Sequence, residues 1–280
     1  MDVRPAAVAG TWYPGTRGAL TREVDGYLSA VPTLPPFAVQ AVIAPHAGIM
    51  FSGPVAAYAY TAAAAAGPYD VVALVGPSHF SAFEGVAVYP GRAFETPLGL
   101  SPIDAAGVTA MVASPVVNTL AAPHAREHSL EMQLPFLRRL LPEVPIVPML
   151  MGFQRRETII GLADALSSAF AGRRALLVAS TDLSHFFDAA TAASLDAQVQ
   201  SRVAALDPEG LLGLIERYPE HDRGRFVACG AGPAIAVLLA ARALGATEAR
   251  ILKYGHSGQI SGDLTGVVGY LAAAIGKPVS

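Results

Sequence analysis

The 280-residue chain is poor in cysteine and in charge. Its single cysteine, Cys229, excludes an internal disulfide framework and suits a reducing compartment. Nineteen basic residues against 22 acidic ones give a formal net charge of -3. The chain therefore lacks the basic surface with which proteins neutralise nucleic-acid phosphates, and we expect no nucleic-acid partner.

A long uninterrupted apolar run is also absent, although 52% of the residues are hydrophobic. The most apolar stretch, "AAYAYTAAAAAG" at 56–67, is too short to span a bilayer, which takes about 20 residues. The N-terminus carries Asp2, Arg4 and Pro5 where a secretory signal needs a continuous apolar segment. These absences predict a protein without a membrane helix that stays in the cytoplasm.

The chain does contain short runs rich in Val, Ile and Leu that alternate with longer helical stretches. This alternation is typical of strand, helix, strand units in a mainly parallel sheet. We predict a single α/β domain over residues 1–280, with a central mixed, mostly parallel sheet flanked by helices. Central strands are expected at 39–44, 71–76, 144–151 and 175–180, and less regular ones at 85–89, 249–254 and 266–272. Helices are expected at 54–66, 103–112, 129–141, 156–171, 190–206, 209–217 and 231–244.

Three of the expected central strands end close to a histidine. His46 follows the first in "AVIAPHAG", His79 the second in "ALVGPSHF", and "LLVASTDLSHF" places Asp182 and His185 after the third. Because the carboxyl ends of parallel strands form the crevice where ligands bind, we expect these side chains to converge at one edge of the sheet. Histidines together with a carboxylate can hold a divalent transition metal, as in non-haem iron sites.

Cys229 is a further candidate ligand. In "RFVACGAGPAIAVLLAA" it stands just before a glycine-rich start of an apolar helix, and a helix N-terminus favours the thiolate form that binds metals. The alternative is that Cys229 is simply a small buried apolar residue, as free cysteines often are.

The segment "HAREHSLEMQLPFL" at 124–137 is expected to open a helix with Glu127, His128 and Glu131 on one face. These groups could lie in a solvated first turn. They could also supply an acid, a base or a supporting partner to a metal site.

Two further polar or aromatic segments stand out. Trp12, the only tryptophan, lies in "GTWYPG" and either covers the core or walls a ligand pocket. The late loop "KYGHSGQISGD" contains His256 and Asp263, to which the sequence assigns no role.

Taken in order, six motifs resemble those of the Memo family, also described as AmmeMemoRadiSam system protein B. They are "AGTWYPG", "APHAG", "GPSHF", "EHSLEMQLPF", "STDLSHF" and "CGAGPAIAVLL", from residue 9 to about residue 239. The late "KYGHSG" and "GVVGYLA" extend the likeness nearly to the C-terminus. The resemblance implies the fold of the class III (LigB-like) extradiol dioxygenases, with a metal site at one edge of a mixed sheet.

The resemblance also implies roles for single residues. His46, His79 and Cys229 correspond to the two histidines and one cysteine of the family's metal or pocket site, where the related dioxygenases have a glutamate in place of the cysteine. Iron(II) is the expected metal, and copper or zinc also suit such ligands.

The remaining residues are expected around that site. Asp182 and His185 match a polar pair lining the cavity and, with His128, are the candidates for acid, base or substrate-orienting groups. Trp12 matches an aromatic wall, and Glu131 is expected to contact the ligand with it.

Two functions from different classes follow. One is a metalloenzyme that carries out an oxygen-dependent or redox reaction on a small molecule or modified peptide. The alternative is a non-catalytic adaptor that keeps the ancestral pocket and binds a peptide or partner protein, since one fold hosts many functions. The family name also implies a functional link to an AMMECR1-domain protein and a radical SAM protein.

Overall fold

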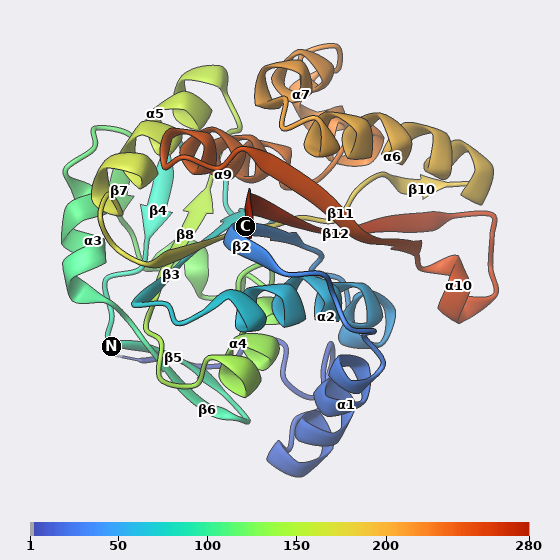
Figure 1. Cartoon of the computed structure of the whole chain (residues 1–280), viewed down its shortest axis with the longest axis horizontal. Coiled ribbons are helices and arrows are strands. Elements are labelled where there is room, and N and C mark those ends of the chain that lie inside the picture. The colour runs from blue at the N-terminus through green and yellow to red at the C-terminus, as the bar shows by residue number, and fades with distance from the viewer. Residues whose placement is uncertain (1–2, 280) are drawn as a thin grey trace.

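The computed structural model describes residues 3–279 and shows one α/β domain with a mixed sheet between two layers of helices (Figure 1). Within these residues the main sheet has nine strands in the order β10-β12-β2-β9-β3-β8-β4-β7, with β11 paired to β12. In that order the strands are β10 (His185–Phe187), β12 (Val267–Pro278), β2 (Phe37–Ala44), β9 (Ala175–Ser180), β3 (Val71–Pro77), β8 (Ile146–Met151), β4 (Val86–Val88), β7 (Val117–Thr119) and β11 (Glu248–His256). A small second sheet is formed by β1 (Val3–Arg4), β5 (Ala93–Thr96) and β6 (Gly99–Pro102).

The four strands at the centre of the sheet run parallel. β2 pairs with β9, β9 with β3 and β3 with β8, while β12 runs antiparallel to β2 and β4 antiparallel to β8. The predicted mixed sheet is therefore confirmed, but among residues 3–279 it is not mostly parallel: four of its eight strand pairings are parallel and four antiparallel. Its central strands bury both faces, because successive side chains alternate between them: Ile43 packs into one core cluster and Val42 into the other.

Helices cover both faces of the sheet (Figure 1). One face is covered by α1 (Arg17–Ser29), α2 (Ile49–Ala66) and α4 (Leu134–Leu140). The other is covered by α3 (Ala105–Val112), α5 (Arg156–Ala169), α6 (Ala189–Ala204), α7 (Pro208–Ile215) and α9 (Ala231–Ala243). The short elements are α8 (Glu220–Phe226), α10 (Gly258–Ser261), η1 (Ala122–His124) and η2 (Glu131–Gln133).

The prediction of a helix at 129–141 is wrong for its first turn. The structure has a 3-10 turn, η2, before α4 begins at Leu134, and residues 127–130 are not helical.

The sequence analysis also did not predict α1 and α8, and the reason is the same for both helices. α1 buries only Leu20 and Val24 and α8 buries no residue, so neither has a marked apolar stripe.

By length and composition alone, α2 could cross a membrane. However, 56% of its 18 residues are buried inside the protein, where it packs against β2 and β12. α8 and α9 pass the same test only as a pair bent by 81°. A core helix meets these criteria equally well, and the cytoplasmic location stays a prediction.

Glu131 binds the N-terminal segment, residues 4–13, to the rest of the domain. This fully buried carboxylate forms an ion pair with Arg4 and accepts hydrogen bonds from the Tyr13 hydroxyl (2.6 Å) and from the backbone N–H groups of Ala7 (2.8 Å) and Val8 (3.0 Å). The expectation that Glu131 contacts a ligand is therefore corrected. Its oxygens are buried and already occupied by the protein's own donors.

Replacing Glu131 with alanine should lower the free energy of unfolding by about 3–5 kcal/mol, because it leaves the buried Arg4 guanidinium without its counter-charge. Urea denaturation measures this change. The control is Glu143→Ala, since Glu143 is exposed, and it should change the same quantity by no more than about 0.5 kcal/mol. Equal effects of the two substitutions would contradict the role of Glu131 as an anchor.

Candidate metal centre

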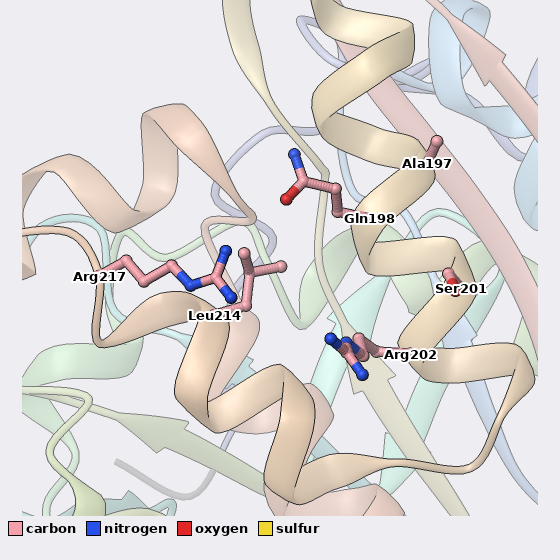
Figure 2. A pocket seen from close by; sticks show the side chains of 6 residues that line it. All are labelled: Ala197, Gln198, Ser201, Arg202, Leu214 and Arg217. Atoms are coloured by element: carbon pink, nitrogen blue, oxygen red, sulfur yellow. The ribbon is translucent and has the colours of Figure 1, made fainter.

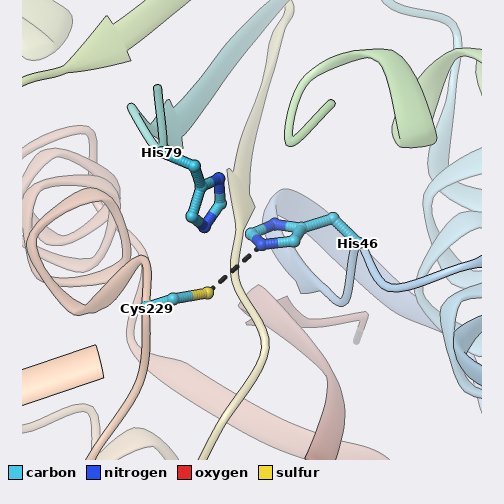
Figure 3. Close-up of side chains that lie close together, drawn as sticks. All are labelled: His46, His79 and Cys229. Atoms are coloured by element: carbon cyan, nitrogen blue, oxygen red, sulfur yellow. Dashed lines mark hydrogen bonds between the residues drawn. The ribbon is translucent and has the colours of Figure 1, made fainter. Parts of the chain in front are cut away.

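Three adjacent strands, β2, β9 and β3, deliver polar side chains to the same edge of the sheet. His46 follows β2 and His79 follows β3, while Cys229 comes from the turn before α9. One ligand atom from each of these three residues lies within 4.8 Å of the other two (Figure 3). Cys229 Sγ is 3.2 Å from His46 Nε2, so residues far apart in sequence form one compact cluster.

The hydrogen bonds of His46 determine which of its nitrogens is free. His46 Nδ1 lies 2.8 Å from the Ser180 hydroxyl, whose own hydrogen is donated to the carbonyl of Ser129 (2.6 Å). The Ser180 oxygen must therefore accept the Nδ1–H of His46, as it also accepts an N–H from Gln133 (2.8 Å). Nε2 is therefore the His46 nitrogen that faces Cys229 and could bind a metal.

Glu127 orients His79 in the way that Ser180 orients His46, by accepting its Nδ1–H. Its buried carboxylate accepts His79 Nδ1–H (2.9 Å) and the backbone N–H groups of His79 (2.6 Å), His128 (3.0 Å) and Ser129 (2.9 Å). His79 Nε2 is then the nitrogen that faces the cluster. The sequence analysis placed Glu127 near the site without identifying this pairing. An acid in a polar turn can orient a histidine from anywhere in the chain, so only its position in space reveals its partner.

Mutual attraction sets the charges of Cys229 and His79. Burial on its own would raise the pKa of the Cys229 thiol, but the imidazoles of His46 and His79 outweigh it and lower this pKa to about 6. Burial likewise disfavours a charged His79, yet the Cys229 sulfur and Glu127 raise its pKa to about 10. Without a metal, the pair at neutral pH is a thiolate beside an imidazolium.

His128 and Trp12 lie beside the histidines of the cluster. The ring centroid of His128 lies 4.5 Å from that of His79, 5.5 Å from that of His46 and 4.2 Å from that of Trp12. Burial, together with the charges of the two other histidines, lowers the pKa of His128 to about 3, so its ring is neutral at physiological pH. Trp12 is 37% exposed and covers His128 from outside, as a pocket wall would.

His79, Glu127 and His128 form a second group whose candidate ligand atoms lie within 4.8 Å of one another. This group shares His79 with the first. The carboxylate of Glu127 already accepts four N–H bonds, and His128 Nδ1 is 3.5 Å from it. We therefore interpret the second group as support for His79.

Asp182 and His185, the two polar residues predicted after β9, are not among the candidate metal ligands of the described residues. Asp182 Oδ1 accepts the backbone N–H groups of His46 (2.7 Å) and Ala47 (3.3 Å), so it holds the turn that carries His46. His185 begins β10, pairs with Val268 of β12 and belongs to neither group of candidate ligands among the described residues. Its catalytic role, like that of Asp182, stays a prediction.

Two other features lie away from the cluster. The hollow in Figure 2, about 370 Å³, lies between α6 and α7 and contains none of the predicted site residues; its lining includes Gln198, Arg202 and Arg217. Asp263 accepts hydrogen bonds from the backbone and hydroxyl of Thr265 within its own loop. Neither feature contributes to the cluster of His46, His79 and Cys229.

Comparisons with known proteins show what this chain is similar to. The family model described as Memo-like protein matches residues 4–274. A MEMO1 family protein of Methanothermobacter thermautotrophicus is 36% identical over 280 residues, covering 96% of this chain and 98% of that protein. One of Methanopyrus kandleri is 36% identical over 286 residues, covering 96% and 97%, and one of Aquifex aeolicus is 33% identical over 272 residues, covering 97% and 98%.

The solved structure of an uncharacterized protein from Escherichia coli K12 is similar in fold. Its TM-score is 0.54 at 15% sequence identity, over 83% of this chain and 99% of that one. At this identity the likeness concerns the fold alone. The family match over nearly the whole chain is specific, and this protein therefore belongs to the Memo-like family.

Proposed function

We propose that the protein binds one divalent transition-metal ion through His46 Nε2, His79 Nε2 and Cys229 Sγ, with iron(II) as the expected metal. The observation that carries the proposal is the convergence of these atoms within 4.8 Å. Each imidazole can offer Nε2 to the metal because Ser180 and Glu127 accept the Nδ1–H bonds, and His79 gives up its Nε2 proton when the metal binds. A thiolate completes a ligand set that also suits copper and zinc.

A metal held on one face by three protein ligands keeps open positions for oxygen or a substrate. This supports an oxygen-dependent or redox reaction on a small molecule or modified peptide as the function. A shared pathway with an AMMECR1-domain protein and a radical SAM protein is part of the same proposal and rests on the family resemblance alone.

The residues around the cluster can orient a ligand and shape the pocket. His128 is neutral and partly shielded by Trp12, and a pKa of about 3 makes it a weak base, so it is suited to hydrogen-bond a ligand beside His79 rather than to take up its proton. Asp182 acts by holding the His46 turn, since its carboxylate is bonded to that backbone.

Exposed aromatic side chains favour a second candidate function, that of a non-catalytic adaptor that binds a peptide or partner protein. Phe80 is 52% exposed, and its ring lies 5.8 Å from that of His128, which the partly exposed Trp12 also contacts. Purification without oxygen, metal analysis and oxygen-uptake assays with and without catechols separate the two functions. Stoichiometric iron with oxygen consumption supports the enzyme, and a protein that takes up no metal supports the adaptor.

Single substitutions of His46 or His79 with alanine, or of Cys229 with serine, should abolish stoichiometric metal uptake, because each removes one of three ligands. Glu127→Gln should weaken binding by about 10–100-fold, since it disturbs only the orientation of His79. Plasma mass spectrometry and titration calorimetry measure these effects. His221→Ala is the matched control, because this histidine is exposed and outside both ligand groups. Full metal content in the His79 variant would remove it from the ligand set.

Metal binding should release protons in a pH-dependent number. Between the pKa of Cys229, about 6, and that of His79, about 10, binding displaces the one proton on His79. Below pH 6 the thiol is protonated as well, so these two groups release a second proton and affinity falls more steeply. Calorimetry in buffers of different ionisation enthalpy counts the protons. A release that stays the same from pH 5 to pH 8 would show that the thiolate and imidazolium pair does not exist.

The only tryptophan should report metal binding directly. Trp12 contacts His128, which lies beside His79, so copper(II) or cobalt(II) at the cluster should quench its fluorescence while the redox-inert zinc should not. The Trp12→Phe variant should lose the signal and keep the metal stoichiometry. Unchanged emission at full copper loading would place the ion elsewhere.

A further inference from the structure

A hollow of about 420 Å³ lies beside the metal cluster, on the side of α8. It is lined by the turn after β8, residues 152–154, and by residues of α8 that include Arg223 and Gly224. Because β8 is the neighbour of β3 and runs parallel to it, this turn lies at the same edge of the sheet as the turn of His79. The volume is within the usual range of small-molecule pockets, about 300–1,000 Å³.

Two lining residues of this hollow touch Cys229. Gln154 Nε2 donates a hydrogen bond to the Cys229 carbonyl (2.6 Å). A side-chain carbon added at Gly224 would lie 3.5 Å from Cys229 Cα, so α8 passes directly over the backbone of this ligand. The hollow and the metal cluster therefore share a wall.

Arg223 provides a fixed positive charge in the hollow. Its Nη1 donates to the carbonyl of Gln154 (2.9 Å) and its Nε to that of Tyr218 (3.3 Å), but among residues 3–279 no carboxylate forms an ion pair with it. Glu216, whose pKa Arg223 helps to lower, is already bonded twice to Arg156. The guanidinium is held in place, and within the described part of the chain no carboxylate is paired with it.

The other charged lining groups are less constrained. Glu220 and His221 are exposed, and His221 is 3.6 Å from Asp222 on the same helix. Their side chains can turn into solvent, whereas Arg223 is anchored by two carbonyl groups. A planar guanidinium presented in this way matches a carboxylate or phosphate.

We propose that this hollow binds the anionic group, a carboxylate or a phosphate, of a small-molecule ligand, with Arg223 as the specificity-determining residue. The inference that the ligand's other end approaches the metal rests on the proposed function. Binding of the anion itself requires only Arg223 and the hollow. A divalent ion with one thiolate and two neutral imidazoles adds a net positive charge, which favours the same ligands.

Titration calorimetry with benzoate, phenyl phosphate and the uncharged benzyl alcohol tests the proposal on metal-free and zinc-loaded protein. We expect benzyl alcohol to bind at least about tenfold more weakly than one of the two anions. Comparing benzoate with phenyl phosphate identifies which anionic group the hollow prefers. The proposal is overturned if neither anion binds better than the alcohol.

The variant Arg223→Gln should weaken binding of the preferred anion by at least about tenfold, because its amide can still bond the Gln154 carbonyl but carries no charge. Arg225→Gln is the control, since Arg225 lies on the same helix over Phe187 and Phe226, outside the lining. It should stay within about twofold of the unchanged protein. Equal affinities of the two variants would overturn the role of Arg223.

If Arg223→Gln does not fold, mapping of phenylglyoxal modification on the unchanged protein replaces it. The preferred anion should protect Arg223 and leave Arg225 reactive, and equal reactivity of Arg223 with and without the anion contradicts the proposal. Metal content is measured separately. Anion binding to a protein that takes up no metal would thus retain the hollow while rejecting the proposed metal function.

Discussion

The arrangement of the site depends on two hydrogen bonds that lie behind the proposed ligands. Ser180 accepts the Nδ1–H of His46, and Glu127 accepts that of His79. An imidazole has one proton for two nitrogens when neutral, so an acceptor at Nδ1 directs a lone pair from Nε2 toward Cys229. Without these acceptors the rings could rotate or change tautomer, and the three atoms would no longer present a common face.

One segment, residues 127–133, supports the site at three points. Glu127 orients His79, and Ser129 and Gln133 hold the Ser180 hydroxyl that orients His46. Glu131 anchors the N-terminal segment that carries Trp12. The segment can do this because its first residues are not helical. In a regular helix Glu127 and Glu131 would share one face, whereas here their carboxylates serve different partners.

The site has two differently built sides. On one side of the cluster the Trp12 ring contacts His128, and on the side of α8 the Arg223 guanidinium, for which we propose an anion-binding role, is bonded to the Gln154 carbonyl. The helix α8 has no fully buried side chain, and it is held by the partly buried Phe226 and by the hydrogen bond from Arg223 to the Gln154 carbonyl. A ligand with a charged end and a larger uncharged part would match this asymmetry.

The sequence alone determined the fold class, the central strands and the convergence of His46 with His79, because both-face apolar runs and residues at strand ends are local signals. The same signal placed His185 with them, but among the described residues His185 joins neither group of candidate ligands. It could not show that Glu127 orients a ligand while Glu131 is an anchor, since both are acids of one short motif. Only the tertiary structure decided this. The role of a buried carboxylate is set by which donors the fold brings to it, and those donors, Arg4 and His79, lie far away in the chain.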